Sequence, residues 1–297
     1  MNSNITPVGI IGLGLMGQAF AKRLAEKNIA VLGFDINQER CNEFGGDRIC
    51  QTPNSLAKQC ETLILCLFDG KQISQVLLGE NGIIHDSSSI IQNIICTSTC
   101  EPNEVIEIAK ACEDHGVHFL EMPISGTSKQ VSNGDSLGLM GGDEHLIKEL
   151  EPILSAMCQK RMHVGGIGNA SKSKLAVNLV LGLHRAALAE GLVFGSQIGL
   201  DPTTLLNILQ NSAAASSVMK VKGPLMANRD YDNPQSRVDQ SLKDFGLIQK
   251  LASQSEQVLP FATQYIQLLE SCVQSGEGKK DNAIIAEAIR RNGNINK

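Results

Sequence analysis

The chain has 297 residues, 42% of them hydrophobic, which is enough apolar material for two folded domains. The net charge is −5 and no run of lysine or arginine occurs, which argues against nucleic acid and an anionic membrane surface as partners. Nine cysteines without a C-x-x-C pair are typical of a reducing compartment, so we expect a cytoplasmic protein. The short polar segment at residues 1–6 has no secretory-signal pattern.

Neither a metal site nor a membrane span is expected. Cys96 and Cys100 are four residues apart with no histidine near them in the sequence, and the six histidines are scattered. Residues 175–200 form the most apolar long segment but contain Arg185 and Glu190. A charge at the centre of a bilayer costs about 2.5 to 3.5 kcal/mol. We therefore predict a buried helix of a soluble domain, with Arg185 in a buried ion pair.

A glycine-rich turn follows the first apolar segment, residues 8–11. Gly12, Gly14 and Gly17 form the pattern G-x-G-x-x-G at the start of an amphipathic stretch. In a dinucleotide-binding βαβ unit these glycines provide a tight turn, close approach of the backbone to a pyrophosphate, and helix-to-strand packing. The unpaired N–H groups and the positive end of the helix dipole then face the diphosphate. The residues expected at this cofactor site are Gly12, Gly14, Leu15, Met16 and Gly17.

The second predicted strand, residues 30–34, ends at Asp35, which lies 18 residues after Gly17. A carboxylate at this point accepts hydrogen bonds from the adenosine ribose and repels the 2′-phosphate of NADP. Ile36 and Asn37 supply no cation for that phosphate, and Arg40 is expected to be a surface helix arginine. The sequence therefore favours NAD as the cofactor, with NADP possible.

Apolar strands then alternate with polar or helical segments, which is typical of an α/β fold with a doubly wound, largely parallel sheet. The predicted strands are residues 62–67, 91–97, 117–121, 136–140 and 161–164. From about residue 170 onward the chain is predicted to be all-helical, with breaks at residues 199–202, 223–224, 233–234 and 275–280. We predict an NAD-binding Rossmann domain at residues 1–165 and an all-α domain at residues 166–297, which begins with a long interdomain helix.

Three later segments could carry chemistry. Ser125, Gly126 and Thr127 form a turn whose consecutive N–H groups and hydroxyl suit a carboxylate, although a plain turn is the commoner meaning of such a motif. Lys174 and Asn178 are four residues apart and share a helix face. A helical lysine is usually a solvated charge, but one in an apolar cleft beside an asparagine can donate a proton to a developing alkoxide. Partial burial and the positive helix end would both ease the loss of its proton. A further cation, Lys243, is predicted near the start of another helix, at residues 242–245.

Four separated motifs occur in the order seen in the β-hydroxyacid dehydrogenases, and the chain resembles that family from residue 8 to about residue 281. They are the glycine fingerprint with Met16, Pro123-Ile124-Ser125-Gly126, the helix start from Gly168 to Asn178, and Lys243-Asp244. The family includes the 3-hydroxyisobutyrate dehydrogenases and the tartronate semialdehyde and glyoxylate/succinic semialdehyde reductases. The resemblance implies a Rossmann domain followed by a helical domain, a site between them, and a homodimer or homotetramer.

The resemblance also implies roles for individual residues. Lys174 would be the catalytic acid/base, and Asn178 its neighbour at the substrate. Ser125, Gly126 and Thr127 would bind the substrate carboxylate. Ser98 and Thr99 would touch the cofactor, and Lys243 would lie near the nicotinamide and the substrate. The expected reaction is reversible hydride transfer between the nicotinamide and a small hydroxy acid or semialdehyde.

Several residues depart from the family pattern. Glu121 replaces the usual aspartate at the end of its strand, and Thr127 replaces a second glycine and would narrow the anion pocket. Cues to the glyoxylate and succinic semialdehyde branch conflict with Asp35, which is typical of the NAD-using branches, so the substrate stays open. An imine reductase of the same fold is an alternative, but such enzymes typically lack the lysine found at Lys174. A non-catalytic dinucleotide-binding protein is another alternative. The decarboxylating 6-phosphogluconate type would need a phosphate pocket that the sequence does not indicate.

Overall fold

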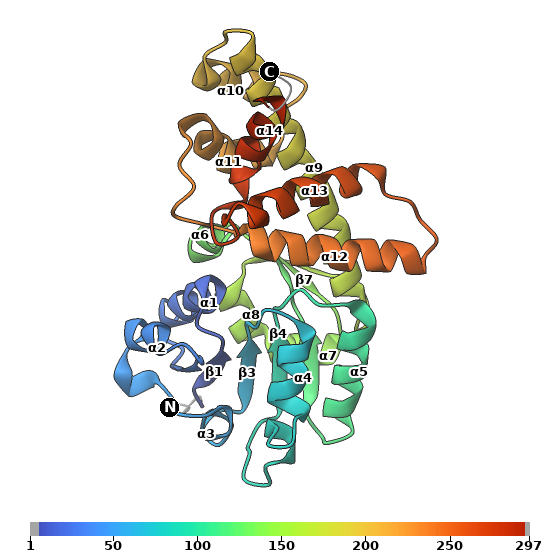
Figure 1. Ribbon diagram of the computed structural model, residues 1–297. Helices are drawn as coiled ribbons and strands as arrows, with labels where there is room; N and C mark the ends of the chain where they lie inside the picture. The colour runs from blue at the N-terminus through green and yellow to red at the C-terminus, as the bar shows by residue number, and fades with distance from the viewer. Residues whose placement is uncertain (1–5, 295–297) are drawn as a thin grey trace. The chain divides into compact units, whose positions relative to one another are not determined.

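The computed structural model describes residues 6–294 and divides into two compact units, one up to Lys174 and one from Leu175. Residues 1–5, which belong to the segment without a secretory pattern, lie outside the described residues. The first unit is α/β and the second is helical (Figure 1). This confirms the predicted fold class, a Rossmann-type domain followed by an all-helical region.

Within residues 6–174 the main sheet is parallel and has the strand order β2-β1-β3-β4-β5. The strands are β1 (Val8–Ile11), β2 (Val31–Phe34), β3 (Thr62–Leu65), β4 (Asn93–Cys96) and β5 (His118–Glu121). Val8 pairs with Val31 on one side and with Thr62 on the other, so β1 lies between β2 and β3 and the strand order reverses beside it. Ligands of doubly wound sheets bind at the carboxyl ends of the strands at such a switch point.

Successive residues of the strands face two different cores, because side chains of a strand alternate between the faces of its sheet. Ile10 packs with α1 (Leu15–Ala25) and α8 (Glu151–Met157) on one face. Its neighbour Ile11 packs on the other face with α3 (Pro53–Ala57), α4 (Gly70–Leu78) and α5 (Pro102–Glu113). Figure 1 shows α4 and α5 together on one side of the strands. Burial on both faces explains why these strands read as continuous apolar runs.

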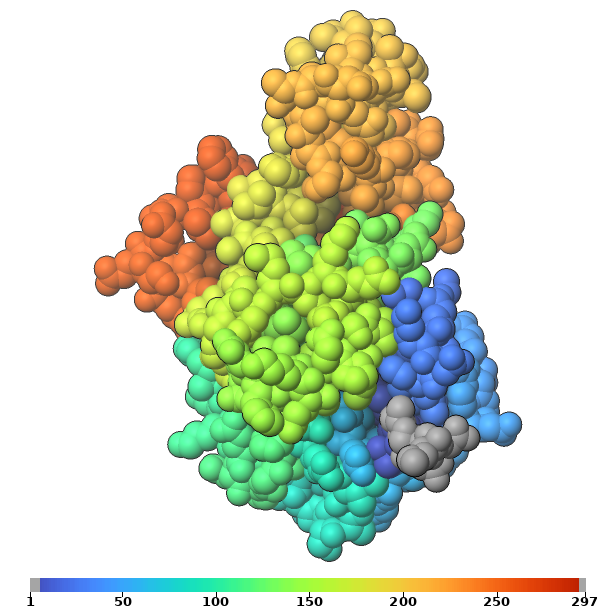
Figure 2. Space-filling model, turned by 180° about the vertical axis from the view of Figure 1, so that it is seen from behind, coloured from blue at the N-terminus to red at the C-terminus, as the bar shows by residue number. Residues whose placement is uncertain are grey.

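The strands that follow β5 do not extend the main sheet, and the prediction of one continuous sheet was wrong here. They form a second, three-stranded sheet of β6 (Ile124–Ser125), β7 (Leu137–Met140) and β8 (Lys160–His163). β6 and β7 are antiparallel, whereas β7 and β8 are parallel. Pro123 separates β5 from β6, and because it has no N–H it cannot donate to a ladder. Residues 144–163 form much of the face of this unit seen in Figure 2 (green to yellow-green).

The helical part begins with α9 (Asn169–Gln197), close to the predicted residues 170–198. It continues with α10 (Pro202–Gln210), α11 (Ser217–Asn228), α12 (Val238–Gln254), α13 (Pro260–Gln274) and α14 (Ile285–Asn294). The predicted break at Gly223 and Pro224 was wrong, because both residues lie inside α11. A Cβ on Gly223 would come 2.4 Å from Leu206 of α10. This glycine therefore permits close helix packing and does not mark a turn.

The helix α9 is buried on one side only, so the prediction of a buried helix was half right. Leu188 and Leu192 belong to the core of the second unit, but Val180 is 51% exposed and Phe194 is 64% exposed. By length and composition alone α9 could cross a membrane, with a mean hydropathy of 1.4 over a window of which 33% is buried. Its core contacts are those of a central helix in a helical unit.

Arg185 on α9 is buried, as expected, but not in the predicted ion pair. Its guanidinium donates a hydrogen bond to the hydroxyl of Tyr265 on α13 and lies 6.0 Å from the centre of that ring. Among residues 6–294, no carboxylate lies within ion-pair distance of Arg185. Tyr265 is itself 1% exposed, so the phenol supplies the acceptor that a carboxylate was expected to provide.

Candidate active site

The three glycines of the loop after β1 have three different surroundings. Gly12 has a φ of +96°, and a Cβ there would lie 2.4 Å from the carbonyl oxygen of Cys66. A Cβ on Gly17 would lie 1.9 Å from the carbonyl oxygen of Gly12. At Gly14 the nearest atom is Nη1 of Arg40, at 3.9 Å. Gly12 and Gly17 are therefore required by the fold, whereas Gly14 leaves space beside the backbone.

That space lies at the start of α1. Gly14 is the N-cap residue, and no side chain in the described part of the chain hydrogen-bonds there as a cap. The first turn contains no acidic residue, and Leu15 is 46% exposed. The N–H groups and the partial positive charge of the helix end are therefore available to an anion. These residues fit the diphosphate of a dinucleotide.

Asp35 is held against this loop by three donors. Its Oδ2 accepts hydrogen bonds from the Leu13 N–H at 2.8 Å and from Nη1 of Arg40 at 3.2 Å. Its Oδ1 accepts one from the Asn37 N–H at 2.8 Å. The side chain of Asp35 is 4% exposed and that of Arg40 is 40% exposed. Arg40 is thus not simply a surface arginine, as the sequence suggested, because it places a cation beside the predicted ribose acceptor.

The predicted cofactor residue Ser98 connects the carboxyl ends of two strands. Its Oγ accepts a hydrogen bond of 3.0 Å from the N–H of Leu67, just after β3. The Cys66 thiol lies 3.3 Å from the hydroxyl of Thr97, and burial raises the pKa of Cys66 to about 12. Ser98, Thr99, the glycine loop and Asp35 therefore follow strands that end at the same edge of the sheet.

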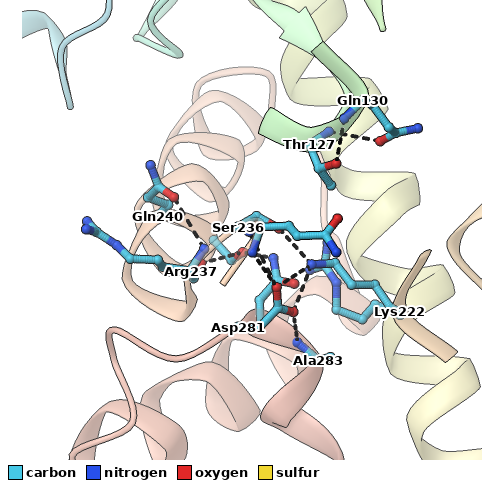
Figure 3. Close-up of polar contacts among 12 residues, drawn as sticks. Thr127, Gln130, Lys222, Ser236, Arg237, Gln240, Asp281 and Ala283 are labelled. Carbon is cyan, nitrogen blue, oxygen red and sulfur yellow. Dashed lines mark hydrogen bonds and ion pairs between the residues drawn. The ribbon is translucent and has the colours of Figure 1, made fainter. Parts of the chain in front are cut away.

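The predicted anion turn is built differently at its last residue. Thr127 begins α6 (Ser128–Ser132) as a capping box (Figure 3). Its N–H donates to Oε1 of Gln130 at 2.9 Å, and its hydroxyl accepts from the Gln130 N–H at 3.3 Å. Both polar groups of Thr127 are thus engaged with Gln130. Ser125 and Gly126 precede this cap.

A buried carboxylate that the sequence did not single out as functional holds the start of α9. Glu121, the last residue of β5, is 1% exposed. Its Oε1 accepts from the Ala170 N–H at 3.0 Å, and its Oε2 accepts from the N–H and the hydroxyl of Ser171 at 3.0 and 2.6 Å. The positive helix end that we expected to act on Lys174 is therefore offset by a negative charge. The sequence signal was an acidic residue at the end of an apolar strand.

The lysines of α9 lie on different faces. Lys174 is 8% exposed, whereas Lys172, two residues earlier, is exposed. One turn beyond Lys174, the Nδ2 of Asn178 donates a 2.9 Å hydrogen bond to Oδ2 of Asp244. Nζ of Lys243 is 3.1 Å from Oδ1 of the same carboxylate. Asp244 thus joins two predicted site residues, a role that the sequence analysis missed.

Lys243 lies within α12, which begins at Val238, and not near the helix start that the sequence suggested. The bond between Asn178 and Asp244 spans 66 residues, so its only sequence signal was the Lys243-Asp244 pair itself. Across residues 6–294, no group of three or more histidine, cysteine or acidic side chains is arranged to hold a metal ion.

Comparison with known proteins covers nearly the whole chain. Residues 7–166 match the family model of the NAD-binding domain of 6-phosphogluconate dehydrogenase. Residues 168–289 match that of the NAD-binding domain of NADP-dependent 3-hydroxyisobutyrate dehydrogenase. The chain is 28% identical to glyoxylate/succinic semialdehyde reductase 1 of Arabidopsis thaliana over 285 residues, which covers 95% of this chain and 98% of that protein.

Two further relatives agree. L-threonate dehydrogenase of Escherichia coli K12 is 27% identical over 282 residues, covering 94% of this chain and 93% of that protein. A crystal structure of 3-hydroxyisobutyrate dehydrogenase from Salmonella typhimurium superposes with a TM-score of 0.84 at 25% identity, covering 94% of this chain and 98% of that one. The chain therefore belongs to the β-hydroxyacid dehydrogenase family and is an NAD(P)-dependent oxidoreductase.

Proposed function

We propose that the protein catalyses reversible hydride transfer between NAD(P) and a small β-hydroxy acid or semialdehyde, with Lys174 as the acid/base. The observation that carries this proposal is the contrast within one helix turn between buried Lys174 and exposed Lys172. Burial shields the ammonium of Lys174 from bulk water, which suits a group that exchanges its proton with a bound substrate.

In this mechanism Lys174 moves the proton. During reduction its Nζ donates a proton to the carbonyl oxygen, and during oxidation the neutral amine accepts the proton of the hydroxyl. The dinucleotide, when bound, supplies or accepts the hydride. Asn178 directs its amide nitrogen to Asp244, which orients its carbonyl oxygen as an acceptor for the substrate hydroxyl. Lys243, whose charge is balanced by Asp244, offers an N–H donor to an acidic substrate.

The substrate carboxylate is assigned to Ser125 and Gly126, through a hydroxyl and a backbone N–H. Thr127 is engaged with Gln130 as a helix cap, so its contribution is to shape the turn and restrict its size. The names of the relatives point to substrates of this class: glyoxylate or succinic semialdehyde, L-threonate, and 3-hydroxyisobutyrate. Each of these compounds is a small acid that also carries a carbonyl or hydroxyl group.

For the cofactor we propose NAD ahead of NADP. Asp35 supports this, since its buried carboxylate would repel a 2′-phosphate and accept from a free hydroxyl. Arg40 offsets part of that charge at 3.2 Å, which is why NADP is retained as possible. Residues of the glycine loop with Ser98 and Thr99 are the proposed contacts.

We also propose a cytoplasmic homodimer or homotetramer that binds neither nucleic acid nor a membrane. Nine free thiols support a reducing compartment. Large apolar side chains are exposed on the second unit, among them Phe194, Ile198, Ile208 and Phe261. A second copy of the chain would cover such surface. Light scattering at micromolar concentration tests the assembly, and a monomer would contradict it.

The activity is tested by following NADH and NADPH oxidation with glyoxylate, succinic semialdehyde and small oxo acids. The reverse reaction is followed with L-threonate and 3-hydroxyisobutyrate, and a cyclic imine serves as the comparison substrate. Turnover of an acidic carbonyl compound that greatly exceeds turnover of the imine supports the proposal. Turnover of the imine alone would favour an imine reductase, and cofactor binding without any turnover would favour a non-catalytic dinucleotide-binding protein.

A further inference from the structure

We propose that Glu121 is a positioning residue for Lys174. Its buried carboxylate fixes the first turn of α9 and thereby sets where the acid/base side chain lies. The inference rests on the proposed role of Lys174, and the experiment below separates the two.

The contact is strong and buried. Both carboxylate oxygens of Glu121 accept hydrogen bonds from α9, two from the backbone N–H groups of Ala170 and Ser171 and one from the Ser171 hydroxyl. Ser171 is 1% exposed, as is Glu121. Hydrogen bonds to an ionised acceptor are about twice as strong as neutral ones, and in a dry setting they hold a fixed geometry. The end of β5 is therefore tied to the beginning of α9 across about 50 residues of sequence.

The surroundings are shaped for a carboxylate at this position. The backbones of Glu121 and Gly141 exchange two hydrogen bonds, of 3.0 and 2.9 Å. A Cβ on Gly141 would lie 2.3 Å from Oε1 of Glu121. A larger residue at position 141 would therefore push the carboxylate away from α9. The glutamate at position 121 therefore requires the glycine at position 141.

The register of α9 decides which lysine is buried. Lys174 lies four residues after Ala170, so it stands about 6 Å farther along the axis and on the same face. Side chains of a helix also lean toward its N-terminus, which directs Lys174 back over the anchored turn. Each residue turns a helix by about 100°, so a small rotation of the first turn moves Nζ sideways. A misplacement of about 1 Å can cost a catalytic group 10²-fold in rate.

The test is a double-mutant cycle on kcat with Glu121→Gln and Lys174→Met. Gln keeps the size of Glu, but its NH₂ group faces donors and its charge is lost. We expect Glu121→Gln to lower kcat tenfold or more while the Kd for NADH changes less than twofold. In the Lys174→Met background the same change should leave the residual kcat unaltered, because a residue that acts through Lys174 has no effect once Lys174 is gone.

Two variants control for a general loss of stability. Asp143 caps α7 (Glu144–Glu149) in the same unit by accepting from the N–H groups of His145 and Leu146 at 2.7 and 3.2 Å. Asp143→Ala removes this cap, so it should lower the melting temperature and leave kcat unchanged. Glu121→Asp keeps the charge and should retain more kcat than Glu121→Gln. If Glu121→Gln does not fold, Ser171→Ala removes only the hydroxyl donor and should show the same non-additive loss at a smaller size.

The outcomes are distinguishable. An equal loss of kcat from Glu121→Gln with and without Lys174 would overturn the positioning role, as would full kcat in Glu121→Gln. Full activity in Lys174→Met would instead overturn the proposed function. A loss of kcat in Asp143→Ala as large as that in Glu121→Gln would mean that stability alone governs kcat.

Discussion

The side-chain amide of Asn178 on α9 donates a 2.9 Å hydrogen bond to the carboxylate of Asp244 on α12. Oδ1 of that carboxylate faces Lys243 at 3.1 Å, so one acid orients an amide and balances a cation. The orientations of the Asn178 and Lys243 side chains therefore depend on Asp244 as well as on their own rotamer preferences. Two predicted site residues, one for the substrate and one for the cofactor, therefore depend on a third residue that contacts both.

Replacement of Asp244 by Asn should therefore impair substrate use. We expect kcat/KM to fall about tenfold, or about 1.4 kcal/mol, while the Kd for NADH changes little. The matched control is Asp239→Asn on the same helix, which removes the negative charge that faces Arg237 at 2.9 Å and should leave kcat/KM intact. Steady-state kinetics with the best substrate of the panel decides it. Equal effects of the two substitutions would contradict the orienting role.

Lys174→Met should preserve the apolar packing of the side chain and delete the proton donor. We expect kcat to fall 10²-fold or more, as for the loss of a general acid, with NADH affinity nearly unchanged. Lys172→Met is the control, since Lys172 is exposed and should matter little. Stopped-flow turnover and fluorescence titration of NADH measure the two quantities. Loss of NADH binding in Lys174→Met would show that the residue maintains the fold of the site and not the chemistry.

Substitutions of Asp35 and of Arg40 should shift the preference between NADH and NADPH in opposite directions. Asp35→Asn removes the charge that repels a 2′-phosphate and should reduce the ratio of NADH to NADPH affinity about tenfold, or about 1.4 kcal/mol. Arg40→Met removes the cation 3.2 Å away and should raise that ratio. Dissociation constants for both cofactors, measured on each variant, check this. Unchanged ratios in both variants would remove the pair from cofactor selection.

The buried pair of Lys222 and Asp281 predicts a pH dependence of stability. Nζ of Lys222 is 2.8 Å from both oxygens of Asp281, which also accepts the Ala283 N–H (Figure 3). Burial lowers the pKa of Lys222 from 10.5 to about 8, against the opposing pull of Asp281. Between pH 8 and pH 10.5 the unfolded chain thus binds more protons at this lysine than the folded chain, so its contribution to the unfolding free energy rises with pH.

Urea denaturation at pH 7.5, 8.5 and 9.5 measures this contribution as the difference between the natural protein and Lys222→Met. The comparison is needed because buried thiols such as Cys112, whose pKa burial raises to about 12, act in the opposite direction. Lys222→Met should itself cost about 3 to 5 kcal/mol at neutral pH, since it leaves the carboxylate of Asp281 buried without its cation. A difference between the two proteins that does not vary with pH would contradict the lowered pKa.

The cofactor half of the site was predicted from local patterns, and its residues stay predictions. The steric reason for Gly17 is local, because a Cβ there would meet the carbonyl oxygen of Gly12, whereas that for Gly12 involves the distant residue Cys66. Asp35 follows at a fixed distance along the βαβ unit. The domain boundary at residues 165 and 166 stays a prediction. The structure divides after Lys174, and the two family models adjoin between residues 166 and 168.

The predictions that were wrong or missing concern residues whose contacts lie in distant segments of the chain. Gly223 was taken for a helix break because its packing against Leu206 has no local signature. Glu121 and Asp244 went unassigned because their partners lie about 50 and 66 residues away. The main sheet ends with β5, just before Pro123. An alternation of apolar segments does not reveal that the later strands belong to a second sheet. Secondary-structure propensity depends on the residues of one segment, whereas these contacts join two segments that are distant in the sequence.

The contrast among the loop glycines offers a practical tool. Substitution at Gly12 or Gly17 would force backbone atoms apart and would unfold the turn, so a loss of activity there would say nothing about binding. Position 14 has room for a methyl group, with 3.9 Å to its nearest neighbour. Gly14→Ala should therefore yield a folded protein whose melting temperature no longer responds to added dinucleotide. Among the three glycines of the motif, this is where the requirements of folding and of ligand binding can be measured apart.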